Sequence, residues 1–246
     1  SKVVEKVTHL NWPENLLLAD VLREQIKPAD KIAALLQALV WPATRLAPRM
    51  EENGDDELTI IFSSGTTGDP KGVVLTHHNV LSNIDALCDV IRPDASVHLC
   101  ATLPIFHSFG FTAGICFPLL SGFQASYHTS PLDTAQVIEM TRKRRCNVLF
   151  STSTFVSTYA RKAEPEDFAS LKLVVLGAEK MKPHVADYVE EKFGIRPLEG
   201  YGTTELAPVV SLNLPDWLEG DEADAPRCSR EGSIGLPLPG ISVEIA

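Results

Sequence analysis

The chain has 246 residues, enough for one large domain or two small ones. Hydrophobic residues make up 44% and charged residues 22% of the sequence, which is the composition of a globular protein and excludes a disordered one. The formal net charge of −10 argues against binding to a nucleic-acid backbone as the main function, so no nucleic-acid partner is expected.

Residues 1–57 are predicted to form lead-in helices and an acidic linker. Apolar residues recur at helical spacing in residues 16–26 and again in residues 32–40, where Pro42 ends the pattern. Because amphipathic helices usually face a protein core, packing on another domain is the favoured interpretation. An interfacial membrane helix with a basic rim is the alternative. The acidic residues between positions 51 and 57 are typical of an exposed linker.

From residue 58 onward, short apolar strands alternate with helices. Strands are predicted at residues 58–63, 73–75, 97–102, 124–127, 148–150, 173–176 and 196–199. Helices are predicted at residues 79–90, 109–120, 134–144, 154–161 and 183–193. This alternation predicts an α/β fold with a mostly parallel sheet flanked by helices, in which ligands bind outside the carboxyl ends of the strands.

The cysteines and the apolar segments favour a cytoplasmic protein. The five cysteines are odd in number and form no Cys-x-x-Cys pair, which argues against a disulfide framework or a zinc site. The first 13 residues mix polar and apolar side chains, unlike a signal peptide. The longest apolar run, residues 109–120, is shorter than the about 20 residues that a bilayer requires.

The glycine-rich stretch IFSSGTTGDPKG at residues 61–72 has the composition of a phosphate-binding loop. Glycines let several backbone N–H groups converge on an anion, hydroxyls add donors, and a lysine adds a mobile positive charge. Pro70 before Lys71 and Gly72 after it exclude the G-x-x-x-x-G-K-[ST] loop, and the leading Gly-x of G-x-G-x-x-G is missing. A flexible, solvated turn is the alternative.

Further segments follow this loop in order: LPIFHSFG at residues 103–110, VVLGAEKM at 174–181, EGYGTTE at 199–205 and GSIGLPLPG at 232–240. With SSGTTGDPKG at residues 63–72, they resemble the motifs of the adenylate-forming superfamily, which includes acyl-CoA synthetases, luciferases and peptide-synthetase adenylation domains. The resemblance covers residues 58–246 and implies a partial AMP-binding domain.

A narrower resemblance is carried by FHSFG at residues 106–110, STSTF at 151–155, GAEK at 177–180 and LEGYGTTELAPVVSLN at 198–213. These segments resemble the acyl-acyl carrier protein synthetase part of bifunctional 2-acylglycerophosphoethanolamine acyltransferases. That likeness implies fatty acid and acyl carrier protein as partners, phospholipid re-acylation, and a location of the parent at the inner face of a bacterial membrane. A long-chain fatty acyl-CoA ligase, with CoA as the acceptor, is the alternative.

The superfamily resemblance implies that a carboxylate attacks the α-phosphorus of ATP and expels pyrophosphate, with Mg²⁺ bound. It assigns the phosphates to Ser63, Ser64, Gly65, Thr66, Thr67, Gly68 and Lys71. It assigns the remaining nucleotide contacts to Gly177, Ala178, Glu179, Glu199, Gly200, Tyr201, Gly202, Thr203 and Thr204. The implied catalytic residues are Lys71, Thr204 and Glu205, with Glu205 as the metal ligand. The acyl pocket is assigned to His107, Phe109 and Phe155.

A structural alternative exists for several of these residues. Glu205 alone is typical of a solvated loop carboxylate, Tyr201 of a partly buried core tyrosine, and the phenylalanines of plain core. His107 lacks a neighbouring acid in the sequence, and the attack of an ionised carboxylate needs no general base. A packed, hydrogen-bonded histidine is therefore the alternative to a wall of the acyl pocket.

The resemblance also implies an aspartate in a later Thr-Gly-Asp motif, which grips the ribose, and a lysine in a small C-terminal domain. The sequence reaches Ala246 before either, so we expect a central fragment of the large N-terminal domain of an adenylate-forming enzyme, inactive alone. A non-catalytic nucleotide- or acyl-binding module is a second hypothesis. An ATPase or kinase is a third, and it predicts phosphate release from ATP without a carboxylic acid.

Overall fold

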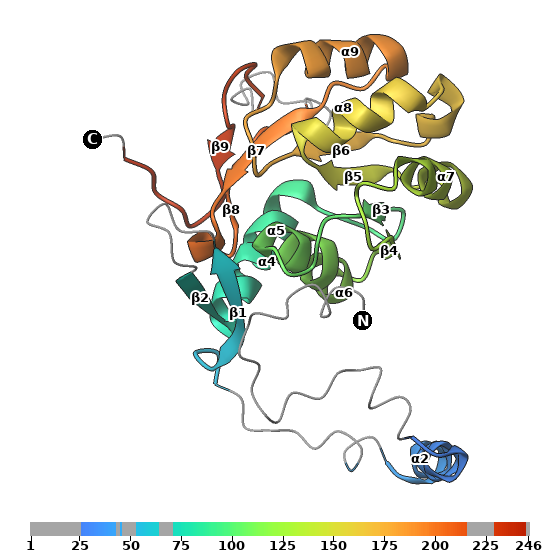
Figure 1. The fold of residues 1–246 in the computed structure, drawn as a ribbon. Helices are drawn as coiled ribbons and strands as arrows, with labels where there is room; N and C mark the ends of the chain where they lie inside the picture. The colour runs from blue at the N-terminus through green and yellow to red at the C-terminus, as the bar shows by residue number, and fades with distance from the viewer. Residues whose placement is uncertain (1–25, 43–44, 46–52, 64–70, 216–228, 245–246) are drawn as a thin grey trace, which may run out of the picture. The chain divides into compact units, whose positions relative to one another are not determined.

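The computed structural model describes residues 26–42, 45, 53–63, 71–215 and 229–244 (Figure 1). The chain divides into two compact units, residues 1–52 and residues 53–246. In the first unit, helix α2 (Pro28–Val40) confirms the second predicted helix, and Asp30 caps it by accepting a 2.8 Å hydrogen bond from the Lys27 N–H. No side chain of α2 is buried. The helix predicted at residues 16–26 lies, except for its last residue, outside the described residues.

The second unit begins with an antiparallel hairpin of β1 (Glu57–Ser63) and β2 (Lys71–Thr76), which forms a two-stranded sheet of its own. The strand predicted at residues 58–63 is therefore confirmed, but it is only partly buried. Ile61 faces the core, whereas the alternate residues Ile60 and Phe62 are exposed on the other face. The apolar run of β1 does not alternate with polar residues, because the side chains on the solvent-facing side of the hairpin are apolar as well.

Residues 53–56, the described residues of the acidic stretch before β1, are part of this unit. Asn53 and Asp56 close a turn in which the Asn53 N–H donates to Asp56 Oδ2 over 3.0 Å. The backbone carbonyl of Asp56 then accepts a hydrogen bond from the His77 N–H at the start of the following helix. Glu57 is the first residue of β1.

The main sheet has the strand order β4-β3-β5-β6-β7-β8-β9 among the described residues. Its parallel part comprises β3 (His98–Ala101), β4 (Gln124–Tyr127), β5 (Val148–Ser151), β6 (Leu173–Leu176) and β7 (Leu198–Gly202). Two short strands that the sequence did not predict, β8 (Val209–Leu212) and β9 (Leu236–Pro237), extend it in antiparallel fashion. The mostly parallel α/β architecture is confirmed.

Helices cover both faces of this sheet (Figure 1). One face carries α7 (Thr134–Arg144), α8 (Ser153–Lys162), the short η3 (Pro165–Phe168) and α9 (Pro183–Phe193). The other face carries α4 (His77–Ile91), α5 (Ser108–Phe111), η2 (Thr112–Cys116) and α6 (Phe117–Ser121). The hydrophobic core on the α7, α8 and α9 face includes Tyr159, and the core on the α4 and α6 face includes Phe117. Both side chains are fully buried. Within the described residues, no helix has the length and apolarity needed to cross a bilayer.

The helix predicted at residues 109–120 consists of three pieces, α5, η2 and α6. At its start, Gly110 lies so close to the preceding loop that a Cβ there would be 2.1 Å from the Pro104 carbonyl oxygen. In the middle, η2 widens into a π-helix whose carbonyl of Thr112 accepts from the Phe117 N–H. Pro118 lies in the first turn of α6, where a proline loses no intrahelical hydrogen bond.

Candidate functional site

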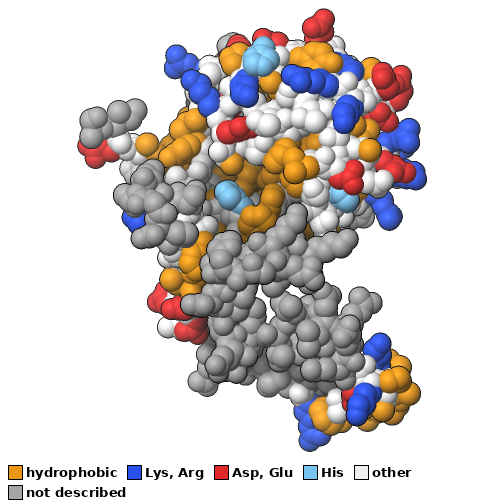
Figure 2. Space-filling model, viewed as in Figure 1, with side chains coloured by type: hydrophobic (Ala, Val, Ile, Leu, Met, Phe, Trp, Pro, Cys, Tyr) orange, Lys and Arg blue, Asp and Glu red, His pale blue; other side chains and the backbone are white. Residues whose placement is uncertain are grey.

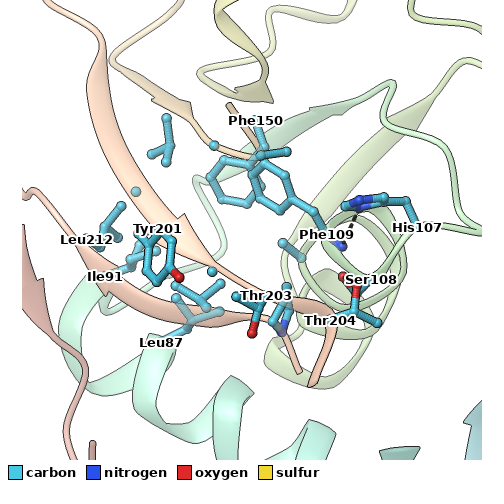
Figure 3. Close-up of a pocket in the computed structure, with 18 residues that line it drawn as sticks. Leu87, Ile91, His107, Ser108, Phe109, Phe150, Tyr201, Thr203, Thr204 and Leu212 are labelled. Atoms are coloured by element: carbon cyan, nitrogen blue, oxygen red, sulfur yellow. Dashed lines mark hydrogen bonds between the residues drawn. The ribbon is translucent and has the colours of Figure 1, made fainter. Parts of the chain in front are cut away.

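A cavity of about 160 Å³ lies beside the carboxyl ends of β5, β6 and β7 (Figure 3). It gathers residues from motifs that are far apart in the sequence. The predicted site residues that line it are His107, Phe109, Gly177, Ala178, Gly200, Tyr201, Gly202, Thr203 and Thr204. This position follows from the parallel sheet, since the loops that leave neighbouring strands at the same edge converge there.

Other lining residues were not predicted as part of the site. Leu87 and Ile91 come from the buried side of α4, and Val209 and Leu212 come from β8. Helical spacing predicted the helix at residues 79–90, but spacing alone does not say which cavity its apolar face adjoins. Ser108 also lines the cavity but was not predicted as a site residue. Its position inside the FHSFG motif is the sequence signal that could have identified it.

At the cavity wall formed by the ends of β6 and β7, two glycines allow neighbouring groups to approach the backbone closely. A Cβ on Gly177 would lie 3.2 Å from Cε1 of Phe109, and a Cβ on Gly202 would lie 2.2 Å from the Pro208 carbonyl oxygen. Between Gly200 and Gly202, the Tyr201 side chain is 45% exposed and its ring borders the cavity (Figure 3). A flat, accessible ring opposite small residues is a suitable surface for stacking a planar base.

Two hydroxyls meet at the opposite side of the cavity (Figure 3). Oγ of buried Ser108, in α5, lies 3.2 Å from Oγ1 of Thr204, at the start of η4 (Thr204–Leu206). The contact ties the FHSFG segment to the end of β7. Because each hydroxyl can donate one hydrogen bond and accept others, this pair can offer a donor to an anionic oxygen in the cavity.

His107 is the N-cap of α5, where its Nδ1 accepts a 3.3 Å hydrogen bond from the Phe109 N–H. His107 is an exposed residue, but partial burial of its ring beside the cavity lowers its pKa from the usual value, because a charged imidazolium loses water there. An accepting Nδ1 belongs to the neutral ring with its proton on Nε2. His107 therefore serves the cavity as a neutral wall and a helix cap.

The apolar end of the cavity contains stacked aromatic rings. Phe109 and Phe150 have ring centroids 6.1 Å apart with an interplanar angle of 24°. Leu87 of α4 lies at the same cavity (Figure 3). Phe155, in contrast, does not line it: Phe155 packs against the core between the sheet and helices α7, α8 and α9. The structure thus gives Phe155 the core position that sequence reasoning held as its alternative.

Glu179 and Glu199 also lie outside the cavity lining, although both belong to the predicted nucleotide motifs. The carboxylate of Glu179 accepts hydrogen bonds from the backbone N–H and the hydroxyl of Thr154. The carboxylate of Glu199, whose residue is 7% exposed, accepts one from the Met181 N–H. Both side chains bind the protein's own backbone.

The predicted phosphate loop joins β1 to β2. Ser63 and Lys71 are register partners at the loop end of the hairpin. Ser64, Gly65, Thr66, Thr67 and Gly68 lie between them, outside the described residues. Glu205 is an exposed residue of η4, which packs against β2, the strand that Lys71 begins. The hairpin and the η4 turn therefore lie side by side, which brings two of the predicted catalytic segments together.

Within the part of the chain that the structure describes, no three histidine, cysteine or carboxylate side chains cluster as a metal site. A single exposed carboxylate still suits Mg²⁺, since this ion usually keeps several waters and is held through one or two carboxylates together with substrate phosphates. Glu205, beside the hairpin, fits that donor pattern.

The chain is similar to known proteins over most of its length. A sequence profile described as AMP-binding enzyme matches residues 4–246. The medium-chain fatty-acid–CoA ligase of Escherichia coli (strain K12) is 29% identical over 202 residues, which cover 79% of this chain and 35% of that protein. The p-hydroxybenzoic acid–AMP ligase of Mycobacterium tuberculosis (strain ATCC 25618 / H37Rv) is 28% identical over 240 residues, or 95% of this chain and 32% of that protein.

The fold agrees with these sequence matches. The crystal structure of ATP-bound MatB from Rhodopseudomonas palustris superimposes with a TM-score of 0.66 and 26% identity, over 78% of this chain and 36% of that one. This chain spans about a third of the length of the curated relatives described above. Because the family profile matches nearly every residue, the chain belongs to the AMP-binding enzyme family.

Proposed function

We propose that this chain forms the nucleotide- and acyl-binding part of a ligase that activates a fatty acid with ATP and then forms an acyl thioester. The observation that carries the proposal is the single cavity on which the FHSFG, GAEK and EGYGTTE segments converge. Its Ser108–Thr204 end is polar and its Phe109–Phe150 end is apolar, as a phosphate and an acyl chain require. Enzymes of this family use ATP with Mg²⁺.

In the proposed first step, a carboxylate oxygen of the fatty acid forms a bond to the α-phosphorus of ATP. The bond from that phosphorus to the bridging oxygen breaks, and pyrophosphate leaves with the electron pair. The Thr204 hydroxyl donates to the α-phosphate, and Lys71 offsets the charge of the outer phosphates. Mg²⁺, held at Glu205, would screen the like charges of the two reactants. Neutral His107 bounds the carboxylate without taking a proton.

The acyl acceptor that we propose is acyl carrier protein, within an enzyme of phospholipid re-acylation. The support is the likeness of the FHSFG, STSTF, GAEK and LEGYGTTELAPVVSLN segments to acyl-acyl carrier protein synthetases. CoA is the alternative acceptor, supported by the Escherichia coli relative, which is a fatty-acid–CoA ligase. Offering each acceptor separately to the full-length protein with a preformed acyl-adenylate distinguishes them by which thioester accumulates.

Re-acylation of phospholipids would place the parent enzyme at the inner face of the cell membrane. The apolar stripe of α2, flanked by Lys27 and Lys31, is the feature that supports a membrane contact. Co-sedimentation with anionic liposomes, with and without residues 1–50, tests it. Equal sedimentation of both forms would show that these residues are not the contact.

Exchange of labelled pyrophosphate into ATP, measured on the full-length protein with a panel of carboxylic acids, tests the activation step. We expect exchange that depends on a fatty acid and falls strongly in Lys71→Ala and Glu205→Ala. Substitution of exposed Lys162 on α8 is the matched control. Phosphate release without any acid would indicate an ATPase, and nucleotide binding without exchange would indicate a non-catalytic module.

We expect residues 1–246 alone to exchange little, since the ribose-binding aspartate and the carboxylate-binding lysine that the resemblance implies are not among them.

A further inference from the structure

We propose that Glu179 and Glu199 are positioning residues that fix one wall of the nucleotide cavity without touching the nucleotide. The inference rests on the proposed function in one respect, namely that the cavity binds the base of ATP. The wall in question is the segment of residues 177–182, which connects β6 to α9 and contributes Gly177 and Ala178 to the cavity.

Glu179 anchors this segment to helix α8. Its Oε1 accepts a 2.5 Å hydrogen bond from the Thr154 N–H, and its Oε2 accepts a 3.0 Å bond from Oγ1–H of the same residue. Thr154 lies in the first turn of α8, where backbone N–H groups have no partner within the helix and favour a carboxylate. Burial raises the pKa of Glu179, but the hydrogen bonds from Thr154 and Thr152 and the charge of Lys182 together outweigh it and leave the pKa below the usual value.

Glu199 anchors the other end of the same segment to strand β7. Its Oε1 accepts a 3.0 Å hydrogen bond from the Met181 N–H, and the residue is only 7% exposed. Oγ of Ser153 adds a third anchor by accepting from the Lys182 N–H over 3.2 Å. Side chains of α8 and β7 therefore take up backbone donors that the segment, being outside the sheet ladder, cannot pair itself.

The segment needs this support because part of it is strained. Ala178 has a φ of 65°, in the left-handed region that residues with a Cβ rarely adopt. Such a conformation persists only where its surroundings hold it. Gly177, next to it, already lies close to Phe109, so a shift of the segment in that direction is blocked and a release would widen the cavity. The two carboxylates thus hold in place the segment that forms this wall of the cavity.

The test uses Glu179→Ala and Glu199→Ala in the full-length protein, with Glu179→Gln and Glu199→Gln as conservative partners. We expect the KM for ATP and the Kd for AMP, measured by calorimetry without acid, to rise about tenfold in the alanine variants, as for one lost charge-assisted hydrogen bond. The glutamine variants should recover part of this loss, because an amide oxygen still accepts. The kcat and the KM for the fatty acid should stay within about twofold of wild type. Glu191→Ala, on the exposed side of α9, is the matched control and should change nothing.

Inosine triphosphate separates positioning from direct contact. A positioning residue weakens ATP and inosine triphosphate by the same factor, whereas a residue that binds the adenine amino group changes their ratio. Thr154→Val removes only the hydroxyl donor to Glu179 and should reproduce part of the Glu179→Ala effect, non-additively with it. This variant keeps the test informative if removal of the Glu179 carboxylate prevents folding.

The outcomes also separate this inference from the proposed function. Weaker AMP binding in the alanine variants, in a protein that shows no acid-dependent exchange, would support the positioning role and overturn the ligase proposal. Unchanged nucleotide affinity in variants of an active ligase, or an altered ATP to inosine triphosphate ratio, would overturn the positioning role alone. A wild-type protein that binds no adenine nucleotide would overturn both.

Discussion

Gly202 lies where a single added carbon meets backbone. A Cβ there would be 2.2 Å from the Pro208 carbonyl oxygen, which also accepts a 2.9 Å hydrogen bond from the Thr203 N–H. We expect Gly202→Ala to destabilise the protein by about 1–3 kcal/mol, the usual cost of overpacking, because the clash is with backbone that has little room to shift. The free energy of unfolding in urea measures this.

The control for Gly202→Ala is Gly114→Ala in η2, where a Cβ would meet nothing within 4 Å. That change should be neutral or stabilise by up to about 1 kcal/mol, since alanine restricts the unfolded chain more than glycine does. Similar losses of unfolding free energy in both variants would show that the close approach of backbone at Gly202 is not the cause of the destabilisation.

His107 should titrate below the usual range for histidine. Burial lowers its pKa, so the folded state favours the neutral ring more than the unfolded state does. The resulting stability is present at pH values above the unfolded pKa and is lost as the pH falls through the lower, folded pKa. An NMR titration of the ring protons, with the signal assigned by its disappearance in His107→Gln, gives the value. A midpoint at or above 6.5 would contradict this reading of the cavity.

At the scale of elements, helix α4 supplies Leu87 and Ile91 to the cavity and starts at a capping box. Oγ1 of Thr76 accepts from the Asn79 N–H over 3.2 Å, and Oδ1 of Asn79 accepts from the Thr76 N–H over 3.0 Å. We expect Thr76→Ala to lower the free energy of unfolding by about 1 kcal/mol. Thr76→Ser keeps the accepting oxygen and should lose much less, so equal losses in both variants would point to the missing methyl group and not to the cap.

The elements that the sequence predicted best are those with both a periodic pattern and a marked end. Helices α7 and α9 and strand β6 begin and end where the sequence placed them: α9 starts at Pro183 and stops before Gly194. Strands β8 and β9 were missed because four residues and two residues carry too little pattern to recognise. The apolar run of residues 58–63 predicted strand β1, but such a run does not indicate which sheet the strand joins.

The same limit explains the site residues. Motif order placed Gly177, Tyr201 and Thr204 at one cavity, since parallel strands bring their carboxyl ends together. It could not tell that Glu179 and Glu199, inside the same motifs, direct their carboxylates to Thr154 and Met181. Side-chain direction depends on partners that are distant in the sequence, so the position of a residue within a motif does not fix where its carboxylate points.

At the scale of the whole molecule, the two compact units differ in what holds them together. Both hydrophobic cores lie inside the second unit, between Leu58 and Ile241. The described helix of the first unit, α2, contributes no buried residue, and Ile32 and Leu39 on its apolar stripe are 60% and 73% exposed. Figure 2 shows hydrophobic side chains gathered on this helix, and a second gathering across the middle of the larger unit, below helices α8 and α9.

Because burial of apolar surface is the main stabilising force, the second unit should fold without the first. We expect a protein that lacks residues 1–52 to keep the circular dichroism and the thermal midpoint of the 246-residue chain within about 4 °C, the shift that a 1 kcal/mol change produces in a domain of this size. It should also be more soluble, since the stripe of Ile32, Leu35 and Leu39 is removed. If the shortened protein loses its cooperative transition, or if its thermal midpoint falls by much more than this, residues 1–52 complete the core of the larger unit. Helix α2 would then be part of that unit's fold and not of a separate unit.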